Sequence, residues 1–243
     1  MSRLALSLAA DEVHVWSAVL DRTAAEIAEL AALLASDELE RVARMHCART
    51  HVEFTVGRGL LRTLLAAYLD VDPMRIRFAL GQAGKPELRE PAGTGLHFNV
   101  THSHGLALYA LTRRCPVGVD VEQVRPLSDF LGLAERYFSP REVAILRGLP
   151  DEHRTEAFFH AWTRKEAFLK ARGVGLSYGL ERVEVTLGRL EPARLLRLDG
   201  EERAAGCWSL CNLEPAPGFI GALALEEHDY RLVCRSWPGG MVQ

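Results

Sequence analysis

Residues 117–122 of this chain read Val-Gly-Val-Asp-Val-Glu, and residues 162–170 read Trp-Thr-Arg-Lys-Glu-Ala-Phe-Leu-Lys. In the first stretch valines alternate with Gly118, Asp120 and Glu122, which is the two-residue period of a β-strand. We expect the valines to face a core and both carboxylates to share the opposite face. Two carboxylates on one face suit a hard cation.

The second stretch belongs to a predicted helix over residues 151–172, which ends before Gly173. Helical periodicity places its apolar side chains on one stripe, with Glu166 and Lys170 along the edge of that stripe. The stripe consists of Phe158, Ala161, Trp162, Phe168 and Leu169. Lys165 falls inside it, so its ammonium must either reach solvent or meet an anion.

Around these two clusters the sequence predicts an α+β architecture, because helices and hairpin-like strands are mixed in each half of the chain. Predicted helices cover residues 24–34, 36–45, 52–69, 128–137, 139–146 and 151–172, and predicted strands cover residues 13–16, 75–80, 96–100, 106–112, 117–122, 182–186, 207–213, 219–225 and 230–236. We expect a seam between the two halves at residues 113–116.

The composition excludes several classes of protein. A formal net charge of -3 argues against a general nucleic-acid binder, which needs a positive surface. Five cysteines without a C-x-x-C spacing indicate neither a disulfide framework nor a zinc knuckle. The apolar run over residues 4–10 is minimal for a signal peptide and is followed directly by Asp11 and Glu12. No apolar stretch is long enough for a membrane helix, so we expect a cytoplasmic protein.

Both clusters also have simpler interpretations. Asp120 and Glu122 could lie on a solvated strand face, and Glu166 and Lys170 could form an ordinary helical ion pair worth about 0.2 to 0.5 kcal/mol. A magnesium site with a diphosphate ligand unites them, because magnesium prefers a few carboxylates together with phosphate oxygens and water.

The other motifs in the sequence do not indicate a specific binding or catalytic site. The stretch at residues 81–86 is too short for a phosphate-binding loop and lacks the serine or threonine that follows the lysine. His102 and His104 form an H-x-H pair without a third zinc ligand placed by spacing. No nucleophile elbow of a hydrolase is present.

Taken together, the motifs resemble those of a known family. They are Gly118-x-Asp120-x-Glu122, Trp162-x-x-Lys165-Glu166-Ala167-x-x-Lys170, Phe98-Asn99-Val100-Thr101-His102-Ser103, Gly84-Lys85-Pro86 and Gly57-Arg58-Gly59-Leu60-Leu61-Arg62. In this order, over residues 41–176, they are similar to the signatures of the 4'-phosphopantetheinyl transferase superfamily, in its long, surfactin-activating (Sfp-like) branch.

The resemblance implies a magnesium-dependent enzyme that carries 4'-phosphopantetheine from coenzyme A to a serine of an apo acyl or peptidyl carrier protein, releasing adenosine 3',5'-bisphosphate. Asp120, Glu122 and Glu166 would hold magnesium, and Lys170 would contact the diphosphate, with Lys165 supporting the same site. The base that accepts the serine proton would be Glu166 or a metal-bound water beside Glu122.

For the nucleotide end of coenzyme A, the resemblance implies a cationic cradle of Arg58, Lys85 and His102. Thr101 stands where the family usually has serine and keeps the hydroxyl. Glu53 stands about where many members have an arginine, so the 3'-phosphate would rely on Arg49 or Arg58.

The resemblance also implies two similar α+β halves, residues 1–115 and 116–243, packed as an internal pseudo-dimer with coenzyme A in the cleft between them. Carrier protein would dock through apolar residues between 127 and 149, and the enzyme would be a monomer. Two other functions remain open: a hydrolase of coenzyme A or another nucleotide diphosphate, and a carrier-binding module without catalysis.

Overall fold

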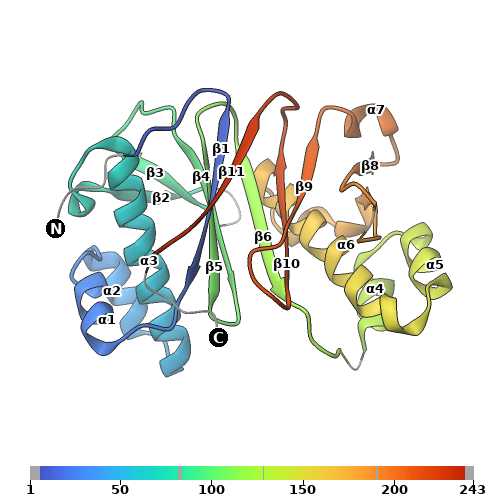
Figure 1. Cartoon of the computed structure of the whole chain (residues 1–243), viewed down its shortest axis with the longest axis horizontal. Helices are drawn as coiled ribbons and strands as arrows, with labels where there is room; N and C mark the ends of the chain where they lie inside the picture. Colours follow the sequence, from blue (N-terminus) through green and yellow to red (C-terminus); the bar gives the residue numbers. More distant parts are fainter. Residues whose placement is uncertain (1–5, 82–83, 128, 190, 239–243) are drawn as a thin grey trace.

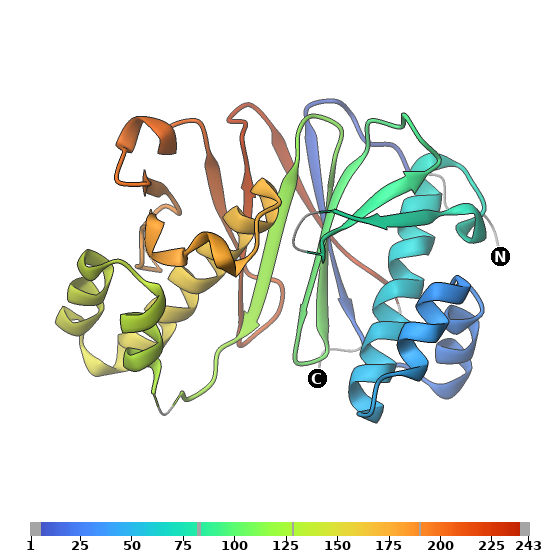
Figure 2. The same cartoon turned by 180° about the vertical axis from the view of Figure 1, so that it is seen from behind.

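Two long helices organise the structure, one in each half of the chain: α3 (Ala48–Leu69) and α6 (Asp151–Arg172). The computed structural model describes residues 6–81, 84–127, 129–189 and 191–238. The strands lie in the middle of the molecule, and the helices cover it at opposite ends (Figures 1 and 2). This arrangement confirms the predicted α+β fold with two halves.

The N-terminal half is built around a four-stranded sheet with the order β11-β1-β5-β4. Its elements are β1 (Glu12–Val19), α1 (Ala24–Ala31), α2 (Ser36–Ala43), α3, β2 (Arg77–Leu80), β3 (Pro86–Glu90), β4 (His97–Ser103) and β5 (Leu106–Thr112). Strands β4 and β5 form a hairpin whose two turn residues, His104 and Gly105, both have positive φ. This is the turn geometry that suits the twist of a hairpin.

The C-terminal half contains a three-stranded antiparallel sheet with the order β6-β10-β9. Its elements are β6 (Val117–Gln123), α4 (Phe130–Tyr137), α5 (Pro140–Gly148), α6, β7 (Val183–Val185), β8 (Leu195–Leu198), α7 (Glu202–Ala205), β9 (Ser209–Leu213), β10 (Phe219–Leu225) and β11 (Arg231–Ser236). The predicted start of α4 at residue 128 lies outside the described residues, as do Gln82 and Ala83 of the rejected phosphate loop.

The last strand departs from the expected division of the chain at residue 115. β11 was expected in the C-terminal half, yet it leaves that half and pairs in parallel with β1. The Arg231 guanidinium contacts the Glu12 carboxylate at the start of the pair. The C-terminal segment therefore completes the sheet of the N-terminal half.

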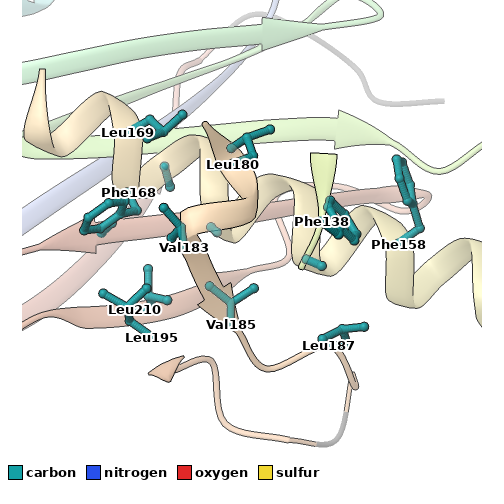
Figure 3. Close-up of a cluster of buried hydrophobic side chains, with 14 of the residues drawn as sticks. Phe138, Phe158, Phe168, Leu169, Leu180, Val183, Val185, Leu187, Leu195 and Leu210 are labelled. Atoms are coloured by element: carbon teal, nitrogen blue, oxygen red, sulfur yellow. The ribbon is translucent and has the colours of Figure 1, made fainter. Parts of the chain in front are cut away.

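The described residues form three hydrophobic clusters. One lies under α3 in the N-terminal half, and another lies around α6 in the C-terminal half (Figure 3). The third lies between the two sheets and contains Val117, Val119 and Val121 of β6 against apolar side chains of β1, β5 and β10. The alternating valines therefore face a core, as predicted, and this core is shared by both halves.

The opposite face of β6 packs closely on α6, and Gly118 makes this possible. A Cβ atom at Gly118 would lie 2.0 Å from the carbonyl oxygen of Ala167 and 2.3 Å from the backbone nitrogen of Ala171. Both atoms belong to the helix backbone, so a larger residue would force strand and helix apart. Since Asp120 and Glu122 share the face of Gly118, the close packing brings both carboxylates to the side of α6.

Candidate active site

The centre of the candidate site is Asp120, a buried carboxylate in the middle of β6. Its Oδ1 accepts hydrogen bonds from the Lys170 ammonium at 2.6 Å and from the Thr101 hydroxyl at 3.0 Å. Lys170 also donates to the Thr101 oxygen at 3.0 Å. Three elements, β4, β6 and α6, therefore meet at one carboxylate, and they come from both halves of the chain.

Strand β4 holds the edge of β6 through side chains rather than through main-chain pairing. The Asn99 amide oxygen accepts from the backbone nitrogen of Val119 at 2.8 Å, and Ser103 donates to Glu122 Oε2 at 2.7 Å. Together with Thr101, these residues occupy alternate positions of β4 and are buried. One polar face of β4 thus fixes the positions of both carboxylates on β6.

Glu166 lies half-buried on α6 beside the same cluster. Burial raises its pKa to about 7, and the negative charges of Asp120 and Glu122 contribute to the rise, whereas Lys170 opposes it. Glu166 stands one helical turn before Lys170 on α6, close enough to interact electrostatically with both carboxylates of β6. A carboxyl group with a pKa near neutrality can exchange a proton under physiological conditions.

The cluster fits a divalent cation in its chemistry. Asp120 Oδ2 is buried and has no hydrogen-bond partner among the described residues, and a buried acceptor of this kind is unfavourable unless something binds it. Three neighbouring carboxylates likewise favour a cation. In the described part of the chain, however, no set of three or more acidic, histidine or cysteine side chains is already arranged to hold a metal ion. The residue types fit magnesium, and the ammonium of Lys170 lies among them.

Lys85 connects the site to a cleft on the N-terminal half. Its ammonium donates to the carbonyl oxygens of Val117 at 3.1 Å and Lys170 at 2.7 Å, and burial lowers its pKa to about 8. It also lines a cleft of about 300 Å³ together with His97 and Pro116. Lys85 therefore lies near the C-terminal end of α6, where it binds the main chain of Lys170, the lysine whose side chain contacts Asp120.

The other two members of the expected cationic cradle lie apart from the acidic cluster. His102 is exposed, and on a strand its side chain faces away from the neighbouring Thr101. The Arg58 guanidinium lies 3.4 Å from Glu38 and stacks on the ring of Phe78. The structure does not bring these two side chains to the acidic cluster.

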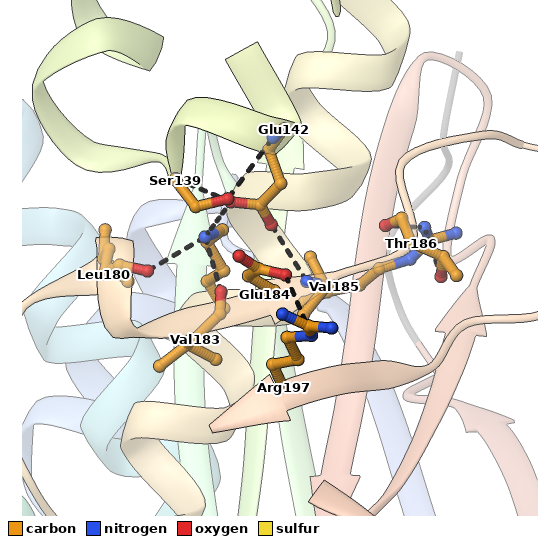
Figure 4. Close-up of polar contacts among 10 residues, drawn as sticks. Ser139, Glu142, Leu180, Val183, Glu184, Val185, Thr186 and Arg197 are labelled. Atoms are coloured by element: carbon orange, nitrogen blue, oxygen red, sulfur yellow. Dashed lines mark hydrogen bonds and ion pairs between the residues drawn. The ribbon is translucent and has the colours of Figure 1, made fainter. Parts of the chain in front are cut away.

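Lys165 does not face the acidic cluster, so its expected place in the cofactor site does not fit the structure. Its ammonium is fully buried and donates to Glu142 Oε2 at 2.6 Å and to the carbonyl oxygens of Leu180 and Val183. Figure 4 shows Glu142 directed into this network from α5. The helical period explains the difference, because Lys165 lies in the apolar stripe and Glu166, one residue on, lies at its edge. Of the two predicted alternatives, reaching solvent or meeting an anion, the structure shows that the ammonium meets an anion.

The sequence assigned no role to several residues that the structure places in or near the site, although three of them, Asn99, Ser103 and Gly118, belong to the quoted motifs. Asn99 and Ser103 position β6, Gly118 allows the helix to approach, and Glu142 neutralises Lys165. The alternation of polar residues at 99, 101 and 103 is a signal that could have revealed the polar face of β4. The partner of Lys165 carries no such signal, because it lies 23 residues away.

Family models match both halves of the chain. Residues 19–113 match the model described as "4'-phosphopantetheinyl transferase, N-terminal", and residues 116–224 match the model described as "4'-phosphopantetheinyl transferase superfamily". The two matches meet at the seam between β5 and β6.

Individual relatives agree with these matches. The chain is 43% identical to 4'-phosphopantetheinyl transferase HetI of Nostoc sp. over 221 residues, which is 90% of each protein. It is 31% identical to a 4'-phosphopantetheinyl transferase of Bacillus subtilis over 93% of each protein. It is also 30% identical to 4'-phosphopantetheinyl transferase Sfp of Bacillus subtilis (strain 168), over 72% of this chain and 74% of that protein. This chain belongs to the 4'-phosphopantetheinyl transferase superfamily.

Proposed function

We propose that the protein transfers 4'-phosphopantetheine from coenzyme A to a serine of an apo acyl or peptidyl carrier protein, with magnesium, and releases adenosine 3',5'-bisphosphate. The observation that carries this proposal is the contact between Lys170 of α6 and Asp120 of β6 at the junction of the two halves, with Glu166 one turn away on the same helix. A diphosphate needs both cationic contacts and a metal, and this cluster offers an ammonium beside carboxylates.

The metal would be held by Asp120, Glu122 and Glu166. Bound there, it would neutralise the diphosphate and stabilise the charge that develops during transfer. Lys170 would contact the diphosphate, and Thr101 would orient that ammonium through the hydrogen bond it already accepts. Glu166, with a pKa of about 7, is the group we propose as the base for the serine proton. Glu122, held by Ser103, would assist it.

We place the nucleotide end of coenzyme A against the N-terminal half, residues 1–115. The cleft beside Lys85 and His97 is the candidate position, since the lysine supplies a cation at its wall. His102 and Arg58 would contact the nucleotide end rather than the diphosphate, because their side chains lie away from the acidic cluster. We assign the metal and catalytic residues to the C-terminal half.

The carrier protein would dock on the apolar surface of α4 and α5. Leu133 and Ile145 are exposed there, with 37% and 43% of their surfaces accessible, and exposed apolar side chains next to a site commonly mark protein contacts. We further propose that the enzyme acts as a monomer in the cytoplasm, with its two halves as an internal pseudo-dimer. The described residues include no helix long and apolar enough to cross a membrane.

The test is to incubate the protein with coenzyme A, magnesium and a panel of apo carriers from fatty acid, polyketide and nonribosomal peptide pathways. Mass spectrometry of each carrier should show the addition of one phosphopantetheine group on its serine. If correctly folded enzyme modifies none of the carriers, the proposal is contradicted. The panel also identifies which carrier class is preferred.

A further inference from the structure

Lys170 occupies Oδ1, one of the two carboxylate oxygens of Asp120 that a metal ion could use. Its ammonium lies 2.6 Å from Asp120 Oδ1 and 3.0 Å from the Thr101 hydroxyl. An ammonium has three donors, and two of them are used on these neighbours. The positive charge in the centre of the acidic cluster is therefore supplied by the protein itself.

The ammonium is also able to leave this position. The Lys170 side chain is 27% exposed, whereas that of Asp120 is 7% exposed. Lys170 thus reaches from solvent to a buried carboxylate on a flexible four-carbon chain. A ligand that arrives from the solvent side can attract the ammonium without any movement of the helix.

We propose that Lys170 is an internal counter-ion, which opposes metal binding until the diphosphate of coenzyme A draws its ammonium away from Asp120. A divalent ion on Asp120 would lie beside the ammonium whether it used Oδ1 or the unpartnered Oδ2. The two cations repel each other strongly in a site screened from water. A diphosphate removes this conflict, because its oxygens can bind the metal and the ammonium together.

The arrangement of the acids agrees with this view. Among the described residues, no three carboxylate, histidine or cysteine side chains are arranged to hold a metal on their own. The negative charge of the carboxylates is thus balanced by Lys170 when no ligand is bound, and by metal only when the diphosphate is present. Binding linkage then requires that metal and coenzyme A each raise the affinity for the other by the same factor. This inference rests on the proposed function.

The test measures binding of Mn²⁺, used as a probe for magnesium, by electron paramagnetic resonance without any turnover. We compare the unaltered protein with Lys170→Met, which keeps the length of the side chain and removes its charge. Without coenzyme A, Lys170→Met should bind Mn²⁺ about tenfold more tightly, within the range typical of coupled sites. Lys170→Arg, which keeps a cation, should bind Mn²⁺ as weakly as the unaltered protein.

Arg172→Met is the matched control, because Arg172 lies on the same helix and donates to Tyr178 rather than to the acids. It changes the net charge equally and should leave Mn²⁺ affinity within about twofold, since exposed charges are screened.

If Lys170→Met raises affinity no more than Arg172→Met, the inference is overturned while the transferase proposal stands. If the unaltered protein binds no Mn²⁺ even with coenzyme A and transfers nothing, both are overturned. Circular dichroism checks whether each variant is folded. If Lys170→Met is not folded, Lys170→Gln is used in its place.

Discussion

Glu166 is the single residue on which the proposed chemistry depends most. Glu166→Gln keeps the shape of the side chain but removes its charge and its ability to accept a proton. We expect transfer to fall at least about 100-fold, which is the usual contribution of a general base. The rate of carrier modification at saturating coenzyme A checks this, and a rate within about threefold of the unaltered enzyme would contradict the assignment.

The pKa of the Glu166 carboxyl group also determines how the stability of the protein should depend on pH. Its pKa rises from 4.5 to about 7 in the folded protein, so between these values the folded state binds more protons than the unfolded state. Stability from this group is therefore lost as pH rises through that window, by at most about 3 kcal/mol for a half-buried carboxyl.

Urea unfolding without divalent metal, at pH values from about 5 to 8, measures the effect. The free energy of unfolding of Glu166→Gln should rise relative to the unaltered protein as pH increases. A constant difference across the range would show that the carboxyl has an ordinary pKa.

Lys165 is expected to serve stability rather than ligand binding. Lys165→Met leaves the Glu142 carboxylate buried without its cation, which should lower the free energy of unfolding by about 3 to 5 kcal/mol. The double variant Lys165→Met, Glu142→Gln should lose less, because no charge is left uncompensated. Coenzyme A affinity of the folded fraction should not change, and a selective loss of that affinity would return Lys165 to the ligand site.

Among the elements, the contact between β6 and α6 positions the site, and Gly118 controls it. Gly118→Ala places a methyl group against two backbone atoms of α6, so we expect a loss of about 1 to 3 kcal/mol in unfolding free energy together with reduced transfer. Gly148→Ala is the control, because a Cβ atom there meets nothing within 4 Å. Equal stability of the two variants by thermal unfolding would contradict the close packing.

Helix α6 shows what local sequence can predict. Its bounds, Asp151–Arg172, agree with the prediction because apolar periodicity defines its body and Gly173, with a φ of 74°, ends it. Strand β3 was missed because its residues are mostly exposed and lack an apolar alternation. Strand β8 has only four residues, which is too few for a periodic signal.

In the site, too, local sequence predicts some features and not others. The acidic pair of β6 follows from the two-residue period, and Glu166 and Lys170 follow from the edge of the apolar stripe. The contact between Lys170 and Asp120 spans 50 residues, and no local pattern predicts it. Motif resemblance supplied the association, and packing of β6 on α6 supplies its physical basis.

For the whole molecule, β11 connects the end of the chain to its beginning. No periodicity within β11 could predict its partner, because parallel pairing with β1 joins segments more than 200 residues apart, such as Glu12 and Arg231. A chain that ends at residue 230 would expose one edge of β1. We expect this truncation to lower the midpoint of urea unfolding and to promote aggregation. An unchanged midpoint would mean that β11 adds little to the sheet.

The most direct test of the central claim is the ratio of two products in one reaction with coenzyme A, magnesium and an apo carrier. A transferase releases one adenosine 3',5'-bisphosphate for each carrier serine modified, whereas a hydrolase of coenzyme A releases it without a carrier. Chromatography of the nucleotide and mass spectrometry of the carrier measure both quantities. We predict a ratio of one and no release when the carrier is omitted. Release that is independent of the carrier would contradict the account.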